Sequence, residues 1–371
     1  MLWGRYDFVD MKLRLPIALL FFATSALLLA ATPTLQMVAS FPDKQVTGIA
    51  VSHTGRIFVC FPDWSDDHTV SVAELVDGKP KAYPDAEWNQ SGVPKNHFVC
   101  VQSVYIDESD SLWILDPASP KMQGVVKGGP KLVKVDLIKN QVVQTIPFSD
   151  EIAPKKSYLN DVRVDTKTQT AYITDSGLGA IVVVDLATGQ ARRLLEDDPS
   201  TQADKDFKLQ VNGRSLLGED GKPPQIHSDG IALDPLNGYL YFHALTASAL
   251  HRIKTDDLRN RRLTKSQLSA KVEEVLETPP PDGMEMGPDG RLYLTDIQDG
   301  FIRVVDLKEN KLNSVIGDGR LSWPDSLAWG PEGALFVTTS QIQTMPRFND
   351  GKDTRTTPYH VYKVIGALTG P

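Results

Sequence analysis

The sequence predicts an all-β fold, a six-bladed β-propeller, from two observations: a segment that recurs six times, and one aromatic residue at a fixed place within it. Each copy begins with a polar residue, alternates in polarity, turns, and continues into an apolar strand. The copies are TGIAVSHTGRIFVC from Thr47, QSVYIDESDSLWIL from Gln102, NDVRVDTKTQTAYIT from Asn160, DGIALDPLNGYLYFH from Asp229, DGMEMGPDGRLYLT from Asp282 and DSLAWGPEGALFVT from Asp325.

Each copy has the pattern of a β-hairpin. The turns, such as PDG and PEG, are rich in residues that set tight-turn dihedral angles. Further apolar strands follow several hairpins, as in LVKVDL from Leu132, which indicates blades of about four strands. We expect the segment from Leu35 to complete the last blade and close the ring. The aromatic positions are Phe58, Trp113, Tyr172, Tyr241, Tyr293 and Phe336.

The N-terminus has the pattern of a signal peptide, predicted for residues 1–31. Lys12 and Arg14 precede an apolar run from residue 15 to 31, and Met11 resembles a natural start, so residues 1–10 can be interpreted as an upstream extension. A transmembrane anchor is the alternative, although the run is shorter than the ~20 residues of a spanning helix. We therefore expect one propeller domain over residues 32–371, secreted or periplasmic and free of the membrane once the signal is removed.

Composition restricts the partners. The 39 basic and 47 acidic residues give a net charge of −8, and no basic cluster is interleaved with aromatics, so nucleic acid is not an expected partner. We expect a monomer that binds a small molecule. Motifs for serine hydrolases, zinc proteases, CxxC redox proteins and nucleotide-binding loops are absent from the sequence.

The mature chain has two cysteines, Cys60 and Cys100. An exported compartment permits them to pair, and we expect a disulfide between them. The alternative is two separate buried thiols.

The candidate site is the ring formed by the first residues of the six copies. In a propeller the first strand of each blade lines the central channel, so equivalent positions lie at one depth. All six are polar and three are carboxylates, which a packed β core would disfavour. The alternative is that such residues cap strand ends. The small residues that follow, including Gly48, Gly230 and Gly283, are expected to keep the channel mouth open.

Roles within the ring follow from side-chain chemistry. Asp229 and Asp282 are candidate proton-transfer groups, and His243, at the end of a second strand, is a candidate acid or base or else a core histidine. Gln102, Asn160 and Asp325 are candidate ligand contacts, with Tyr158 and Trp323 as aromatic partners. No cofactor is certain, but Asn160, Asp229 and Asp282 would suit Ca²⁺ or another divalent cation.

The sequence resembles the major royal jelly protein and insect Yellow family, as a bacterial-type member. The resemblance spans most of the mature chain, and includes GRIFVCFPDW from Gly55, YLNDVRVD from Tyr158, HSDGIALDPLNGYLYFHALTASALHRI from His227 and MGPDGRLYLTDIQDGFIRVVD from Met286. It implies a secreted six-bladed propeller. Dopachrome conversion, biogenic-amine binding and nutritional or structural roles are all attributed to family members, so catalysis stays open.

A more distant resemblance is to gluconolactonase and regucalcin-like propellers. Asn160 and Asp282 match two metal-ligand positions of that family, and Asp229 replaces an asparagine at a third. Thr47 stands where a glutamate ligand is expected, which puts the metal site in doubt.

Three functions remain open from the sequence. The first is a small aromatic or amine-bearing ligand at the channel mouth, with dopachrome-type isomerisation as the reaction if the protein is an enzyme. The second is a metal-dependent lactonase or esterase, and the third is a non-catalytic interaction scaffold.

Overall fold

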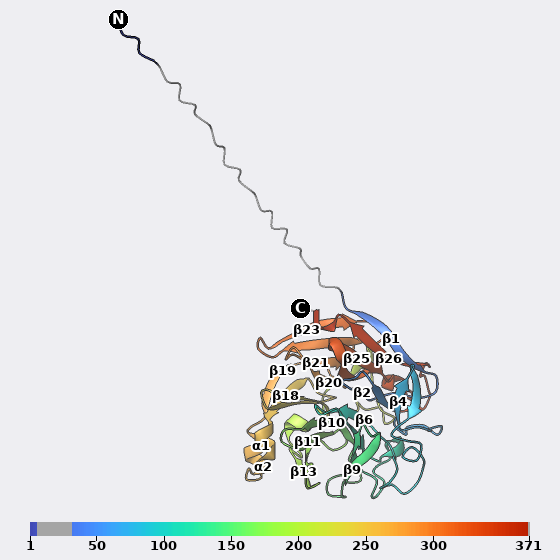
Figure 1. Ribbon diagram of the computed structural model, residues 1–371. Helices are drawn as coiled ribbons and strands as arrows, with labels where there is room; N and C mark the ends of the chain where they lie inside the picture. The colour runs from blue at the N-terminus through green and yellow to red at the C-terminus, as the bar shows by residue number, and fades with distance from the viewer. Residues whose placement is uncertain (6–31, 370–371) are drawn as a thin grey trace. The chain divides into compact units, whose positions relative to one another are not determined.

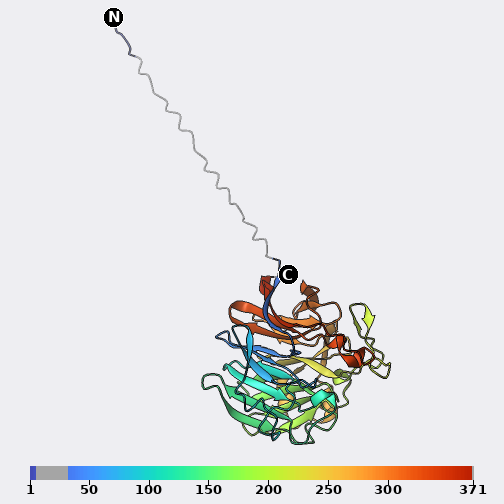
Figure 2. The ribbon, with the colours of Figure 1, turned by 90° about the vertical axis from the view of Figure 1, so that its right-hand side faces the viewer.

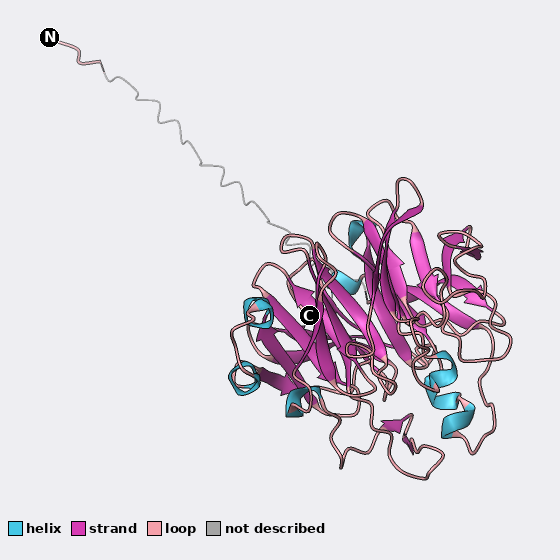
Figure 3. Cartoon of the chain, turned by 90° about the horizontal axis from the view of Figure 1, so that it is seen from below, coloured by secondary structure: helices cyan, strands magenta, loops and turns pink. Residues whose placement is uncertain are grey.

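The computed structural model describes residues 1–5 and 32–369, and within residues 32–369 the chain forms a six-bladed β-propeller, as predicted (Figures 1 and 3). Each blade is a four-stranded antiparallel sheet. Figure 1 places the first strands β2, β6, β10 and β20 near the centre and the last strands β9, β13, β19 and β23 at the periphery. Residues 6–31 of the expected signal peptide lie outside the described residues.

The first three blades follow one another along the chain in strand order, from the inner strand to the outer strand. Blade 1 contains β2 (Ile49–Val51), β3 (Ile57–Cys60), β4 (Val72–Val76) and β5 (Lys79–Ala82). Blade 2 contains β6 (Ser103–Ile106), β7 (Ser111–Asp116), β8 (Lys131–Asp136) and β9 (Gln141–Pro147). Blade 3 contains β10 (Leu159–Asp165), β11 (Thr170–Asp175), β12 (Ala180–Asp185) and β13 (Ala191–Leu194).

The last three blades have the same order, except that the final strand comes from the N-terminus. Blade 4 contains β16 (Ser228–Asp234), β17 (Tyr239–Ala244), β18 (Ala249–Lys254) and β19 (Glu273–Glu277). Blade 5 contains β20 (Met284–Met286), β21 (Leu292–Asp296), β22 (Phe301–Asp306) and β23 (Lys311–Gly317). Blade 6 contains β24 (Pro324–Gly330), β25 (Ala334–Thr339), β26 (Tyr359–Ile365) and β1 (Thr34–Phe41).

The two ends of the described propeller meet in blade 6. Strand β1 pairs antiparallel with β26, with Thr34 opposite Ile365 and Phe41 opposite Tyr359. Figure 2 shows the blue β1 running beside the red C-terminal strands. This pairing closes the ring as the sequence predicted, and it covers strand edges that would otherwise be free to pair with another chain.

The insertions between strands carry the other elements. Two short helices, α1 (Thr255–Arg259) and α2 (Lys265–Ser269), lie at the periphery of blade 4 (Figure 1). A hairpin of β14 (Gln210–Val211) and β15 (Arg214–Ser215) projects at the right of Figure 2. Among the described residues, no helix is both long and apolar enough to span a membrane. The 3-10 turns are Pro120–Met122, Pro199–Thr201, Pro331–Gly333, Ile342–Thr344, Pro346–Phe348 and Ala367–Thr369.

In every blade, the repeated aromatic residue pairs with the residue at the same repeat position of the inner strand. It is buried on the second strand and pairs in register with the fourth residue of the repeat on the inner strand. Because the register repeats, a change at that fourth residue directly alters the channel wall. The pairs are Ala50–Phe58, Tyr105–Trp113, Arg163–Tyr172, Ala232–Tyr241, Glu285–Tyr293 and Ala328–Phe336.

The glycines at the second repeat position act differently from the expectation. A Cβ on Gly283 would lie 2.1 Å from the Asp325 carbonyl oxygen, and one on Gly230 would lie 2.8 Å from the Asp282 carbonyl oxygen. These distances are too short for any side chain. The glycines therefore let neighbouring inner strands approach closely; they do not widen the mouth.

The expected disulfide is not formed, because Cys60 and Cys100 are both free, buried thiols. The Cys60 thiol donates to the Gln102 carbonyl oxygen at 3.1 Å, whereas the Cys100 sulfur is directed at the Asp63 carbonyl oxygen, 4.0 Å away. Burial raises the pKa of Cys60 to about 12, so it behaves as a small apolar side chain at neutral pH.

Candidate functional site

A cavity of about 530 Å³ lies at the end of the channel where the inner strands begin. We call it the aspartate cavity, because Asp229 and Asp282 line it. Its size is that of a site for a small organic ligand. The predicted site residues that line it are Gln102, Tyr158, Asn160, Asp229, Asp282 and Trp323.

Three aspartates come together where blades 4, 5 and 6 begin. Asp229, Asp282 and Asp325 are between 3% and 8% exposed. Burial raises the pKa of all three carboxyl groups, and the pKa of Asp282 reaches about 7. Repulsion by Asp282 adds to the rise for Asp229 and Asp325, and repulsion by Asp161 adds to it for all three. In the described part of the chain, no lysine or arginine forms an ion pair with any of them. The group is therefore an acidic cluster without an ion-pair partner, although Lys155, Lys156 and Arg347 also line the cavity.

The carboxyl groups of Asp229 and Asp282 interact directly. Their mutual hydrogen bond raises the pKa of Asp229 and lowers that of Asp282. The pair therefore titrates as one unit, with Asp229 holding its proton to higher pH. A buried oxygen on each of Asp229 (Oδ1) and Asp325 (Oδ2) has no hydrogen-bond partner in the described structure, which leaves acceptor capacity unused.

Trp323 holds Asp282 in place. Its indole Nε1–H donates to Asp282 Oδ2 at 2.6 Å, and the side chain is 1% exposed. The hydrogen bond lowers the pKa of Asp282 against the effect of burial. The backbone of Trp323 has φ of 53°, in the left-handed region, which costs on the order of 1–3 kcal/mol and is maintained by the surrounding contacts.

A hydrogen-bond chain forms another side of the cavity. Trp64 Nε1–H donates to the Tyr158 hydroxyl at 2.9 Å, and that hydroxyl donates to Gln102 Oε1 at 2.8 Å. Burial raises the pKa of Tyr158 well above its usual value, so the phenol is protonated at neutral pH. Asn160 is 5% exposed and lines the cavity, and the described residues supply no hydrogen bond to its side-chain amide.

Aspartates at the ends of the second strands act structurally. Asp175 accepts hydrogen bonds from the Tyr158 backbone N–H at 2.9 Å and from Arg193 at 2.7 Å. Asp116 forms a buried ion pair with Lys131 at 2.7 Å. These carboxylates are paired, in contrast to the three at the channel mouth, and Asp175 positions Tyr158.

The rim of the cavity comes from loops that the repeat pattern does not describe. Met122, Ile226, Arg347 and Phe348 lie in insertions, and Trp64 follows β3. The Arg347 guanidinium lies 4.7 Å from the centre of the Phe348 ring and contacts the Met122 sulfur. These residues lie outside the six aligned copies, and none of them was a predicted site residue.

Two predicted site residues do not line the cavity. His243 is fully buried: its Nδ1–H donates to the Ala244 carbonyl oxygen at 2.6 Å, and its Nε2 accepts from Thr278 Oγ1 at 3.1 Å. Burial lowers the pKa of His243 to about 4, so it is a neutral core histidine. Its expected catalytic role is not supported. Asp325 also lies outside the lining, and its charge contributes to the raised pKa of Asp229.

The expected divalent-cation site fits the structure poorly. Within the described residues, no group of three or more His, Cys, Asp or Glu side chains is arranged to hold a metal ion. Trp323 already occupies Asp282 Oδ2, and the Thr47 hydroxyl donates to the Gln102 carbonyl oxygen at 3.3 Å. Asn160, Asp229 and Asp282 do line one cavity, but no step of the function proposed below involves a metal.

Solved structures share the fold. A gluconolactonase from Xanthomonas campestris superposes with a TM-score of 0.55 at 12% identity, covering 90% of both chains. A streptogramin B lyase superposes with a TM-score of 0.51 at 12% identity, covering 91% of this chain and 98% of the other. At these identities the similarity concerns the fold alone.

Comparisons of sequence, unlike those of structure, identify the family of the chain. Major royal jelly protein 1 of Apis mellifera is 24% identical over 223 residues, covering 54% of this chain and 48% of that protein. Major royal jelly protein 6 of the same species is 24% identical over 216 residues, covering 53% and 45%. The matches thus span about half the length of these relatives. The Major royal jelly protein family profile matches residues 99–357, and the chain belongs to that family.

Proposed function

We propose that the aspartate cavity binds a small aromatic amine, with the ammonium group against Asp229 and Asp282. The observation that carries the proposal is this pair of buried carboxyl groups, which line the cavity and form no ion pair with any described lysine or arginine. An organic cation supplies the missing charge and takes up the free Asp229 Oδ1. We also propose that the protein acts as a monomer after export.

The rest of the cavity suits the aromatic part of such a ligand. Trp64, Tyr158 and Phe348 line it with aromatic groups, and Ile226 and Leu245 add apolar surface. The Asn160 amide can bond to a ring hydroxyl. A ligand with an ammonium at one end and a polar aromatic ring at the other satisfies both parts.

Proton transfer is the catalytic extension of this proposal. Asp282 has a pKa of about 7, which suits a group that takes and returns a proton near neutral pH. A tautomerisation needs only such a transfer: one proton leaves a carbon of the ligand and one is added to an oxygen or nitrogen, without net oxidation. Dopachrome-type substrates have this chemistry, and their conversion can be followed by loss of the coloured quinone.

The binding experiment is calorimetric titration of the purified protein with dopamine and serotonin. The matched control is hydroxytyrosol, in which a hydroxyl replaces the amine of dopamine. We expect the amines to bind and the neutral analogue to bind at least tenfold more weakly, since it cannot pair with the carboxylates. Equal affinity for dopamine and hydroxytyrosol would rule out the proposed role of Asp229 and Asp282. Parallel titration with Ca²⁺ tests the metal-dependent alternative.

A further inference from the structure

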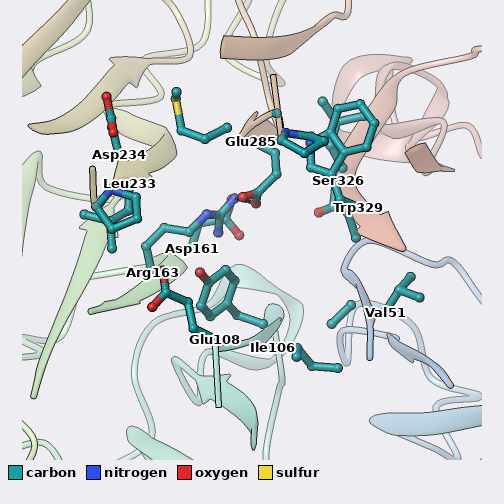
Figure 4. A pocket seen from close by; sticks show the side chains of 18 of the residues that line it. Val51, Ile106, Glu108, Asp161, Arg163, Leu233, Asp234, Glu285, Ser326 and Trp329 are labelled. Carbon is teal, nitrogen blue, oxygen red and sulfur yellow. Dashed lines mark ion pairs between the residues drawn. The ribbon is translucent and has the colours of Figure 1, made fainter. Parts of the chain in front are cut away.

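A second cavity, of about 500 Å³, lies toward the other end of the same inner strands (Figure 4). We call it the arginine cavity, because Arg163 lies in its middle. It shares no lining residue with the aspartate cavity. The second to seventh residues of the repeats contribute most of its wall, whereas the first residues of four of the repeats line the aspartate cavity.

The fourth repeat position shows that this cavity is specialised. Opposite the buried aromatic residue, three blades have alanine, a small apolar residue. The other three have Tyr105, Arg163 and Glu285. These large polar side chains come from blades 2, 3 and 5 and converge on the channel.

Arg163 and Glu285 point toward one another across the pocket in Figure 4. Arg163 Nη2 lies 3.1 Å from Glu285 Oε2 and donates to the Met284 carbonyl oxygen at 2.6 Å, while Nη1 donates to the Val162 carbonyl oxygen at 2.8 Å. The guanidinium carbon is 5.2 Å from the centre of the Tyr105 ring. The cluster therefore joins blades 3 and 5 across the channel.

One donor of this cluster is unused. Arg163 is 5% exposed, and its buried Nε–H has no partner in the described structure. A brace between blades needs only the two terminal nitrogens, which are already satisfied. An unpaired N–H on a buried arginine that lines a cavity is costly unless a ligand accepts from it.

The charged groups at the centre of this cavity are paired, although acidic side chains outnumber Arg163 in its lining. Arg163 forms an ion pair with Glu285; burial raises the pKa of Glu285 and Asp161, and the Arg163 charge opposes that rise. Burial raises the pKa of Tyr105 as well, so its hydroxyl remains a donor. An anionic ligand would face the carboxyl groups of the lining and a cationic ligand would compete with Arg163 for Glu285, whereas a neutral ligand would leave the ion pair intact.

We propose that the arginine cavity binds a small neutral polyhydroxyl compound, a monosaccharide or cyclic polyol. A hydroxyl group both donates and accepts, so it can donate to Asp161 or Glu285 and accept from the Arg163 Nε–H. The ring of Trp329 and the side chains of Ile106 and Leu233 also line the cavity and offer apolar surface to the C–H face of such a ring. The combination of aromatic surface with paired acidic and basic groups distinguishes this ligand class from an amine.

The test is ligand-observed NMR and calorimetry on the purified full chain with D-glucose, myo-inositol, the anion D-glucuronate and the cation D-glucosamine. We expect at least one neutral compound to bind with a millimolar Kd and both charged analogues to bind more weakly. Absence of binding by both neutral compounds, or tighter binding of a charged analogue, overturns the proposal.

Variants locate the binding. Arg163→Lys keeps the charge but removes the Nε–H and the planar fork, and it should weaken neutral-ligand binding about tenfold. If that variant does not fold, Asp161→Asn, which leaves the Arg163–Glu285 pair in place, should weaken binding several-fold. Asp282→Asn in the aspartate cavity is the matched control and should have no effect. Binding that survives the variant in the arginine cavity, or that is lost in Asp282→Asn, overturns the assignment.

Discussion

Both ends of the central channel carry acidic side chains, but these form an ion pair at only one of the two ends. In the arginine cavity, Glu285 is paired with a buried arginine. In the aspartate cavity, no described lysine or arginine forms an ion pair with Asp229 or Asp282, which bond to each other, and Trp323 donates to Asp282. The same repeat thus places an ion-paired carboxylate at one position and carboxyl groups without an ion-pair partner at another. The difference suggests that the end without an ion pair accepts a cation and the other end does not.

We expect the largest effect when a carboxylate is removed at only one end of the channel. Asp282→Asn should weaken dopamine binding about 100-fold, because it removes the charge that faces the ammonium. Calorimetry gives the two dissociation constants. Glu285→Gln is the matched control, since it neutralises a buried carboxyl three residues further along the chain. If Glu285→Gln weakens dopamine binding as much as Asp282→Asn, the two ends do not differ in the proposed way.

Next in size is the pH dependence of amine binding. The pKa of Asp282 is about 7, so the carboxylate is largely protonated at pH 5.5 and ionised at pH 8. A cationic ligand prefers the ionised form, and its affinity should therefore be at least about tenfold higher at pH 8. Titrations at both pH values measure this. A constant affinity, or a higher one at pH 5.5, would show that Asp282 does not face the ammonium.

A smaller effect is expected from the indole that supports Asp282. Trp323→Phe removes the hydrogen bond to Asp282 Oδ2, so the pKa of Asp282 should rise and dopamine affinity at pH 7 should fall about fivefold. Trp88→Phe is the control, because Trp88 packs on Phe98 at 5.1 Å and lies outside the lining of the cavity. The role assigned to Trp323 fails if raising the pH does not restore the affinity of Trp323→Phe.

The smallest effect concerns the stability of the ligand-free protein. The pKa of Asp282 is raised on folding, so between the ordinary aspartate pKa and about 7 the folded state binds more protons than the unfolded state. The contribution of Asp282 to the free energy of unfolding therefore falls as pH rises through that window. We expect the Tm of the wild type to drop from pH 5 to pH 8 by a few degrees more than that of Asp282→Asn. If thermal melts show that the Tm of the wild type and the Tm of Asp282→Asn change equally with pH, this expectation is contradicted.

The sequence predicted the fold because the repeat is a local pattern. Period-two alternation, turn residues and the fixed aromatic at Phe58 and its equivalents determine a blade, and six blades determine the ring. The segment from Leu35 was correctly assigned to the last blade. The glycines were interpreted wrongly, because the distance from Gly283 to the next inner strand cannot be read from the sequence.

The site was predictable within the repeat and immediately before it, where Tyr158 and Trp323 precede the first residues of two copies. Gln102, Asn160, Asp229 and Asp282 share one repeat position and line one cavity. Loop residues such as Arg347 do not align with anything in the repeat. His243 lies in the core, the alternative that the sequence left open, because its ring nitrogens bond to Ala244 and Thr278. The predicted Cys60–Cys100 disulfide was wrong, because the two thiols have separate contacts.

Arg163 was missed although its signal is present in the sequence. The fourth repeat position has alanine in three copies, so arginine, glutamate and tyrosine in the others are conspicuous once the copies are aligned. Only the register with the buried aromatic residues shows that this position lines the channel.

The central claim, that an amine binds against the unpaired aspartates, is tested most directly by counting protons. Dopamine titrations near pH 6.5, in two buffers with different ionisation enthalpies, give the number of protons released on binding. The account predicts release of a substantial fraction of one proton, since the ligand ionises Asp282, and little or none in Asp282→Asn. Dopamine binding without proton release in the wild type, or with equal release in the variant, would contradict it.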